Sequence, residues 1–401
     1  MTNVSSSNGL EKHPKLRFPG FDEPWKEKTL SHYLVENTDR NKKLIFGKED
    51  VLSVSGEYGI VNQIAFQGRS FAGESVADYH VVETGDIVYT KSPLKANPYG
   101  IIKANKGVPG IVSTLYAVYH PSTTVIPKFV DLYFSNDFRL NKFLKPLVNI
   151  GAKHDMKVNN TFVLTGSVIF PSINEQQRLV DFLTMLDNRI DAQRKIVDSL
   201  KKYKRGLLSF TFEEMSISDD ADSTTYLFSE IAQRRKEKYS PGSRVEYPCI
   251  ELEHIEQGTG RLLGSVSSTT QISIKTVAKT GDVLFGKLRP YLRKFAFAEQ
   301  DMVCSSEIWA FVPSKYVLPK YLYYLIQTEH FLRVANISSG TKMPRAEWVN
   351  IEKESFDIPC IPVQDKIIAV MEAVDKRICA SDDTLSLLLK VKEALLQQLF
   401  I

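Results

Sequence analysis

Two segments of this chain combine cationic and aromatic side chains without a single acidic residue, and the first of them also contains Asn97 and Asn105. Lys and Arg neutralise phosphate groups, and Asn and Arg also form bidentate hydrogen bonds with adenine and guanine edges. The segments therefore favour contact with DNA, although a solvated loop has much the same composition. The candidate contacts are Lys91, Lys95, Asn97, Tyr99, Lys103 and Lys106 in one segment and Lys287, Arg289, Tyr291, Arg293 and Lys294 in the other.

A glycine-containing basic loop follows each of these segments further along the chain. Residues 151–154 read Gly-Ala-Lys-His, and residues 340–345 read Gly-Thr-Lys-Met-Pro-Arg. Loops of this kind suit phosphate or base contacts. We therefore add Lys153, Lys342 and Arg345 to the candidate contacts, whereas His154 is better explained as an ordinary exposed histidine.

Motifs that resemble catalytic sites are incomplete in this chain. Residues 281–287 have the spacing of a phosphate-binding loop, but Leu288 occupies the place of the Mg²⁺-binding hydroxyl residue, so a turn and a strand are the better interpretation. Residues 97–99 lack the second proline of the adenine methyltransferase motif, and no Phe-x-Gly-x-Gly loop for S-adenosylmethionine is present. The carboxylate and lysine set of a Mg²⁺ nuclease is also missing. We predict no catalytic residue.

Composition narrows the function further. The 51 Lys and Arg nearly balance the 47 Asp and Glu, so a nucleic-acid surface must depend on where the charge lies. The four cysteines form no Cys-x-x-Cys pair, and we expect neither a metal site nor disulfides. The polar N-terminus and the lack of an apolar run near ~18 residues predict a cytoplasmic protein without a membrane span.

The chain is an internal duplication, which determines the elements that position these segments. Three motifs recur in the same order: residues 84–89 (TGDIVY) as 280–285 (TGDVLF), 112–118 as 305–311, and Pro-Lys-aromatic at 127–129 as 319–321. The end of each copy then aligns without a gap at a shift of 188 residues. The identities there are Pro171, Gln176, Asp187, Arg189, Ile190, Leu200, Lys202, Lys204, Leu207, Leu208 and Phe212 with Pro359, Gln364, Asp375, Arg377, Ile378, Leu388, Lys390, Lys392, Leu395, Leu396 and Phe400. A repeat of this size predicts two similar domains.

Each copy ends in a long predicted helix with apolar residues at a four-three spacing. Both stripes are interrupted at the same step, by Gln193 and by Ser381. A helix of ~35 residues is ~50 Å long, longer than a small domain is wide, so we expect the stripes to pair; packing of each helix on its own domain is the alternative. The seam residues are Leu179, Leu183, Leu186, Ile190, Val197 and Leu200 in the first helix and Ile367, Met371, Val374, Ile378, Leu385 and Leu388 in the second.

The order of these motifs resembles the specificity subunits of type I restriction-modification enzymes over nearly the whole chain. The resemblance is carried by Leu-Arg-Phe-Pro-Gly-Phe at 16–21 with Trp25 and Leu30, the Thr-Gly-Asp strand, the Pro-Lys-aromatic helix, the basic loop, and Pro-x-x-x-x-Gln before a helix with Asp-x-Arg-Ile. Each motif is degenerate, but their order is specific and the pattern occurs twice.

The resemblance implies an α+β fold with two tandem mixed α/β target recognition domains, each followed by a long helix. The two helices would pair as an antiparallel coiled coil that holds the domains in opposite orientations. The expected parts are a polar N-terminal tail at 1–19, recognition domain 1 at 20–170, a central conserved helix at 171–212, an acidic and serine-rich linker at 213–224, recognition domain 2 at 225–358 and a distal conserved helix at 359–401.

The resemblance also implies a non-catalytic, cytoplasmic subunit that reads double-stranded DNA at a bipartite target. Two modification subunits would bind S-adenosylmethionine and methylate adenine, and two restriction subunits would use ATP and Mg as motor-nucleases. The chain itself would hold no cofactor. Two other functions stay open: a self-contained methyltransferase, which the missing cofactor loop disfavours, and a protein-interaction scaffold of two domains on a coiled-coil stalk.

Overall fold

The computed structural model describes residues 2–3, 13–150, 156–214, 223–243, 245–337 and 342–401. Contacts divide the chain into two compact units: unit 1 comprises residues 1–192 and 385–401, and unit 2 comprises residues 193–384. Each unit thus contains one globular domain and segments of both long helices. The predicted basic loop at 151–154, with Lys153, lies outside the described residues, as does most of the predicted linker.

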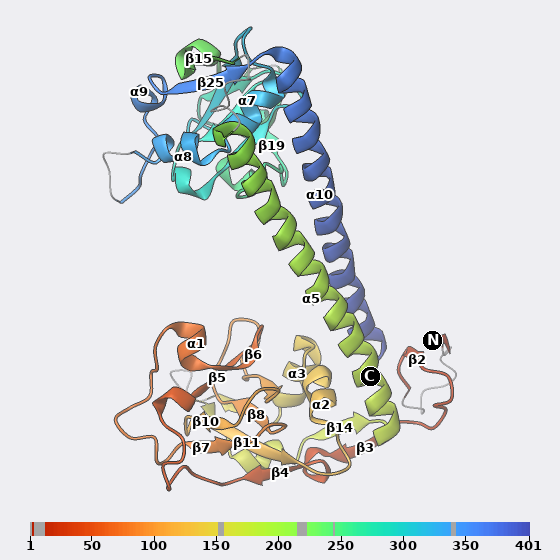
Figure 1. Cartoon of the computed structure of the whole chain (residues 1–401). Helices are drawn as coiled ribbons and strands as arrows, with labels where there is room; N and C mark the ends of the chain where they lie inside the picture. The colour runs from red at the N-terminus through yellow and green to blue at the C-terminus, as the bar shows by residue number, and fades with distance from the viewer. Residues whose placement is uncertain (1, 4–12, 151–155, 215–222, 244, 338–341) are drawn as a thin grey trace. The chain divides into compact units, whose positions relative to one another are not determined.

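The globular part of unit 1 mixes short strands with short helices (Figure 1). Its strands are β1 (Thr2–Asn3), β2 (Leu16–Arg17), β3 (Lys26–Thr29), β4 (Leu34–Asn37), β5 (Leu52–Ser55), β6 (Gly59–Asn62), β7 (His80–Val82), β8 (Ile87–Thr90), β9 (Ile102–Ala104), β10 (Gly110–Val112), β11 (Tyr116–Pro121), β12 (Asn149–Ile150), β13 (Met156–Lys157) and β14 (Ser167–Phe170). Its helices are α1 (Gln63–Gln67), α2 (Pro127–Tyr133), α3 (Asp137–Leu144) and α4 (Asn160–Val163), and the long α5 (Ile173–Ser209) follows.

The globular part of unit 2 repeats this plan. Its strands are β15 (Ser223–Leu227), β16 (Ala232–Arg234), β17 (Lys238–Tyr239), β18 (Pro248–Ile250), β19 (Val266–Ser267), β20 (Lys275–Ala278), β21 (Val283–Gly286), β22 (Phe295–Phe297), β23 (Met302–Cys304), β24 (Ile308–Pro313) and β25 (Ser355–Pro359). Its helices are α6 (Phe228–Ile231), α7 (Pro319–Leu325), α8 (Glu329–Ala335) and α9 (Trp348–Ile351), and the long α10 (Ile361–Gln398) follows.

Each domain is built on a four-stranded antiparallel sheet with the same strand order. The order is β4-β11-β8-β9 in unit 1 and β16-β24-β21-β22 in unit 2. A proline begins both α2 and α7, where its fixed φ and missing N–H suit the first helical turn. Phe129 of α2 lies in one buried core with Tyr89 and Tyr119 of the sheet, and Tyr321 of α7 lies in another with Phe285 and Phe311. The predicted doubled α/β architecture is confirmed.

One part of the sequence alignment between the copies is wrong by a single residue. The equivalence of 112–118 with 305–311 pairs Ala117 with Ala310, but in the sheets Ala117 lies opposite Tyr89 whereas Ala310 lies opposite Leu284. The register makes Trp309, opposite Phe285, the counterpart of Ala117. Because side chains alternate between faces, a one-residue slip moves every side chain to the other face of the sheet.

A buried glutamine fixes the start of each long helix. Gln176 of α5 accepts the Ile126 N–H at 3.0 Å and donates to the Pro171 carbonyl at 3.1 Å. Gln364 of α10 does the same, accepting the Leu318 N–H at 2.8 Å and donating to the Tyr316 and Pro359 carbonyls, both at 2.9 Å. The Pro-x-x-x-x-Gln motif therefore ties each helix to the loop before α2 or α7.

The long helices pair antiparallel, and equivalent residues of the two copies form the contacts. In unit 2, Lys204 of α5 lies 2.7 Å from the Asp375 carboxylate of α10. In unit 1, Lys392 of α10 lies 2.6 Å from the Asp187 carboxylate of α5. Since Lys204 matches Lys392 and Asp187 matches Asp375 in the duplication, the two ion pairs are one interaction made twice with the copies exchanged.

The polar interruptions of the two stripes meet each other. The Gln193 side-chain amide donates to the backbone carbonyl of Ser381 at 3.0 Å. Ile190, Val197 and Ile378 are buried although they belong to no globular core, as pairing requires. All twelve predicted seam residues are buried or half-buried.

The ends of the helices pack differently from their middle. Leu179 and Leu183 of α5 lie in the core of the domain that precedes the helix. The alternative prediction, that each helix packs on its own domain, therefore holds for this first part of α5. The last residues belong to the opposite copy: Leu208 lies in the core of unit 2, and Leu399 and Phe400 lie in the core of unit 1. Each domain core is thus completed by a helix end from the other copy.

The boundaries of the predicted N-terminal tail and linker need correction. Arg17, placed in the tail, is buried in an ion pair with Glu175 at 2.8 Å, because the first turn of α5 presents that carboxylate to it. Ser223 and Thr224, placed in the linker, are paired with β25 as the start of β15. Within the described residues, no helix is both long and apolar enough to cross a membrane.

Candidate nucleic-acid interface

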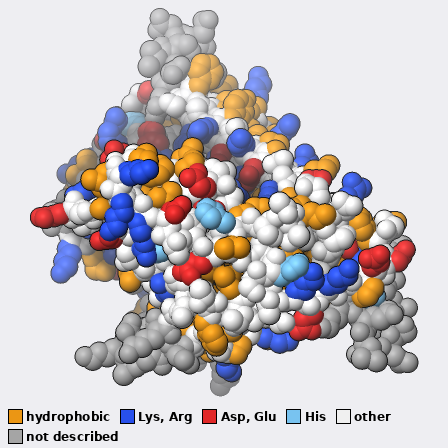
Figure 2. All heavy atoms as spheres, turned by 90° about the horizontal axis from the view of Figure 1, so that it is seen from below, with side chains coloured by type: hydrophobic (Ala, Val, Ile, Leu, Met, Phe, Trp, Pro, Cys, Tyr) orange, Lys and Arg blue, Asp and Glu red, His pale blue; other side chains and the backbone are white. Residues whose placement is uncertain are grey.

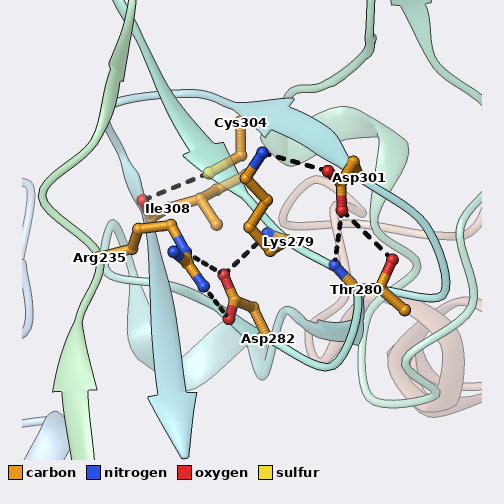
Figure 3. Close-up of polar contacts among 7 residues, drawn as sticks. All are labelled: Arg235, Lys279, Thr280, Asp282, Asp301, Cys304 and Ile308. Carbon is orange, nitrogen blue, oxygen red and sulfur yellow. Dashed lines mark hydrogen bonds and ion pairs between the residues drawn. The ribbon is translucent and has the colours of Figure 1, made fainter.

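The Thr-Gly-Asp motif of unit 2 forms a tight turn rather than a phosphate-binding loop. Gly281 adopts a φ of +91°, a conformation that favours glycine. The Asp282 carboxylate accepts the Lys279 N–H at 2.9 Å and both ends of the Arg235 guanidinium at 2.5 and 2.8 Å (Figure 3). This buried aspartate closes the turn and orients the strand that follows, as the turn-and-strand interpretation predicted.

Unit 1 has the same turn with a different partner for its aspartate. Asp86 is buried and accepts the Glu83 N–H at 2.8 Å. His120, on the neighbouring strand β11, lies 2.6 Å from the same carboxylate, whereas the partner of Asp282 in unit 2, Arg235, directly follows β16. Burial raises the pKa of Asp86, and the hydrogen bonds from Glu83 and His120 oppose that rise.

In unit 2 the turn delivers the two predicted basic segments to one surface. The Arg289 N–H donates to the Pro344 carbonyl and the Ala346 N–H to the Lys287 carbonyl, each at 2.8 Å. Leu288 and Arg345 face each other in this antiparallel bridge. The backbones of residues 287–289 and 344–346 therefore lie side by side, which places Arg289 and Arg345 on adjoining segments, and Lys342 comes shortly before the second segment.

Two candidate contacts anchor the loop after the turn instead of facing solvent freely. The Arg293 guanidinium binds the Glu329 carboxylate at 2.7 and 2.9 Å. The Asn97 amide, which is buried, donates to the Asp137 carboxylate at 2.9 Å. Glu329 and Asp137 are the first residues of α8 and α3, so both loops are held on the same helix start.

Other candidate cations have partners within the chain. Lys106 forms an ion pair with Asp131, and Arg345 forms one with Glu307. Lys294 donates to a backbone carbonyl at 2.6 Å, and Lys91 donates to the Asn160 side chain at 3.1 Å. Burial lowers the pKa of the Lys91 ammonium, but its hydrogen bond leaves donors for a phosphate.

The cations best placed for DNA are the exposed ones. Among the described residues, the side chains of Lys95, Arg289 and Lys342 are exposed and have no hydrogen-bond or ion-pair partner, and Tyr291, two residues after Arg289, is 52% exposed. Lys103, Lys287 and Tyr99 are half-buried. The face drawn in Figure 2 intersperses cationic, acidic and apolar side chains, in keeping with the low net charge.

Sequence reasoning missed one cation at this end of the unit 2 sheet. The Arg234 guanidinium carbon lies 4.7 Å from the Trp348 ring centroid and 5.6 Å from that of Trp309. Arg234 lies outside both basic segments, and only the corrected register brings it next to them. The presence of two of the chain's three tryptophans in one domain was the available signal.

Among the residues that the structure describes, no group of three or more His, Cys, Asp and Glu side chains could hold a metal ion. The described cysteines are all free, and Cys249 and Cys304 are buried. Burial raises the pKa of both thiols, that of Cys249 to about 11.

Comparison with known proteins identifies the scaffold. A family described as the Type I restriction modification DNA specificity domain matches residues 225–386. The type I restriction enzyme HindI specificity subunit of Haemophilus influenzae is 27% identical over 135 residues, 32% of this chain and 29% of that protein. The type I restriction enzyme EcoDI specificity subunit of Escherichia coli is 23% identical over 245 residues, 51% of this chain and 54% of that protein.

The aligned regions cover less than two thirds of either relative, whereas the fold is shared throughout. The S subunit of a type I restriction-modification system from M. genitalium superposes over 97% of this chain and 99% of that chain, with a TM-score of 0.54 and 14% identity. The family match, the two relatives and the doubled scaffold identify this chain as a relative of type I restriction-modification specificity subunits, with a DNA specificity domain of that family at residues 225–386.

Proposed function

We propose that this chain is the non-catalytic, sequence-reading subunit of a type I restriction-modification enzyme. Each globular domain reads one half of a bipartite double-stranded DNA target. The paired helices set the length of the unspecified spacer between the halves and dock the methyltransferase subunits.

The observation that carries this proposal is the exchange of equivalent contacts between the copies. Lys204 pairs with Asp375 and Lys392 pairs with Asp187, and each domain core receives a helix end from the other copy. A duplicated reader joined in this way suits a target made of two separate half-sites. Related scaffolds with different loops then allow the halves to differ in sequence.

The DNA-facing residues are assigned from exposure and from free hydrogen-bond donors. Lys95, Arg289 and Lys342 contact phosphates or bases directly, with Tyr291 beside them. Lys91, Lys103, Lys287 and Arg345 contribute further positive charge, and Lys153 does so from the loop of unit 1. Asn97, Arg293, Lys106 and Lys294 shape the loops through their internal partners, and Tyr99 packs beneath the loop of unit 1.

The partners follow from this role. Two modification subunits supply S-adenosylmethionine and methylate adenine, two restriction subunits supply the ATP- and Mg-dependent motor and nuclease, and this chain supplies no cofactor. The complex works in the cytoplasm, where it meets the DNA.

Titration of duplex DNA with the purified chain at several salt concentrations tests the proposal. A protein that neutralises several phosphates loses affinity steeply and log-linearly with salt. We expect such a slope, and we expect methyl transfer from labelled S-adenosylmethionine only after a modification subunit is added. Salt-independent binding supports a protein scaffold instead, and methyl transfer by the chain alone rules out a non-catalytic subunit.

A further inference from the structure

Two positions correspond closely between the domains but hold opposite chemistry. Glu36 of β4 lies opposite Tyr119, and Arg234 of β16 lies opposite the counterpart of that tyrosine, Phe311. The strands β4 and β16 occupy the same edge of the two equivalent sheets. A carboxylate in one domain therefore takes the place of a guanidinium in the other.

In unit 2 the guanidinium is fixed by aromatic rings. Trp309 and Trp348 lie at an interplanar angle of 80° with their centroids 6.1 Å apart, and Arg234 lies over both rings. Arginine stacks well on aromatic faces because its planar cation is weakly hydrated. Contact with the rings gives the guanidinium N–H groups no oxygen acceptor, so they stay available to donate.

The free donors distinguish Arg234 from its neighbours. Arg235, Arg293 and Arg345 each bind a carboxylate within unit 2. The Arg234 side chain is exposed and has no hydrogen-bond or ion-pair partner among the described residues. Arg289 is also free, but no aromatic ring holds its side chain in place. Arg234 is thus an oriented guanidinium with an open edge.

The counterpart in unit 1 is a chain of hydrogen bonds. Asn160 donates to one oxygen of the Glu36 carboxylate at 2.8 Å and accepts a hydrogen bond from Lys91 at 3.1 Å. Asn160 is the first residue of α4, as Trp348 is the first residue of α9. The second carboxylate oxygen of Glu36 is left as an acceptor. Both domains therefore use the same positions to orient one polar group.

We propose that this position determines base specificity in each domain: Arg234 binds a guanine edge in one half-site, and Glu36 accepts a base amino group, such as cytosine N4, in the other. The inference rests on the proposed function. Arg donating to guanine O6 and N7 and Glu accepting from cytosine N4 are the pairings that the major-groove edges favour. Arg234 adjoins the surface of Arg289, Lys342 and Arg345, because Ala346 and Trp348 come from the same short segment.

The test is a map of methylated adenines made by the complex of this chain with a modification subunit. Arg234→Ala removes the guanidinium, and Arg234→Lys keeps the charge and the stem but not the planar fork. We expect both variants to relax one base of one half-site, with discrimination reduced roughly 5- to 150-fold. Glu36→Gln should affect the other half-site alone. Arg333→Lys, an exposed arginine of α8, is the matched control and should change neither.

Three results bear on the inference separately from the proposed function. An unchanged target in both Arg234 variants overturns the inference and leaves the proposed function standing. A lower unfolding temperature with an unchanged target shows that Arg234 only packs against the tryptophans and also overturns it. If the wild-type complex methylates no bipartite target, the proposed function itself fails.

Discussion

The two exchanged ion pairs predict very different costs for the same substitution. Asp375→Ala leaves the Lys204 ammonium, whose side chain is 8% exposed, without its carboxylate. Asp187→Ala does the same to Lys392, whose side chain is 31% exposed. The two aspartates are equivalent by duplication, but Asp375 also accepts the Tyr324 hydroxyl at 3.0 Å, so its loss removes one further hydrogen bond.

Burial sets the size of each effect. Removing one partner of a buried pair costs about 3–5 kcal/mol, because a charge stays in a poorly solvated place. Partly exposed pairs are worth about 0–1 kcal/mol. Tyr324 keeps its ring 5.5 Å from the Lys204 nitrogen and offsets part of the penalty, so we expect about 3 kcal/mol for Asp375→Ala and less than about 1 kcal/mol for Asp187→Ala.

Urea or thermal unfolding measures both costs in the full chain. For a unit near 200 residues, 1 kcal/mol shifts the midpoint by about 2–4 °C, so Asp375→Ala should lower the unfolding temperature of unit 2 by about 6–12 °C. Burial lowers the pKa of Lys204 while Asp375 opposes it, so loss of that aspartate lowers the pKa further. Equal costs for the two variants would refute the reasoning from burial.

Three further predictions concern other parts of the chain. Burial lowers the pKa of His80 to about 4, so between pH 6.5 and pH 4 its imidazole binds a proton in the unfolded chain but stays neutral in the folded protein. The free energy of unfolding should therefore fall by at most about 3 kcal/mol from pH 7 to pH 4. Thermal melts at stepped pH measure this fall, and His80→Gln should abolish it. Gln364→Leu leaves the Leu318 N–H and two carbonyls without this partner and should cost unit 2 about 3 kcal/mol in urea unfolding, whereas a neutral result would show that water replaces the amide. Duplicating four residues at Gln193 lengthens the helix by ~6 Å and turns it by a net ~40°. A methylation map should then show unchanged half-sites with a spacer longer by one or two base pairs. An active complex with the original spacer would show that the helices do not set the spacer length.

Much of the scaffold could be predicted from the sequence because repetition is a strong constraint. The stripe spacing predicted the paired helices, and the identities of Lys204, Asp187 and Gln176 with their copies marked residues whose contacts the structure shows in both units. A motif that is preserved in both copies has the same structural role in each domain. The Thr-Gly-Asp turn is such a case, since its aspartate closes the turn in each domain.

The candidate interface was harder to predict because composition does not show which cationic side chain pairs with which acidic one. Arg293 and Asn97 looked like DNA contacts, yet each is held by an acidic residue 36 or 40 positions away. Arg234 was missed because its neighbours come from β24 and α9, and the alignment that would have placed Trp309 was off by one residue. These contacts depend on how strands and helices that are far apart in the sequence pair with one another, and a local sequence pattern carries no information about that pairing.

Exchange of one recognition domain tests the central claim most directly. Residues 20–170 would be replaced by the corresponding domain of a relative with a different target, and methylated adenines would be mapped in cells in which this chain and its modification subunit are the only active pair. We expect one half-site to change to that of the donor while the other half-site and the spacer stay the same. Changes in both half-sites would contradict the claim that each domain reads its half independently.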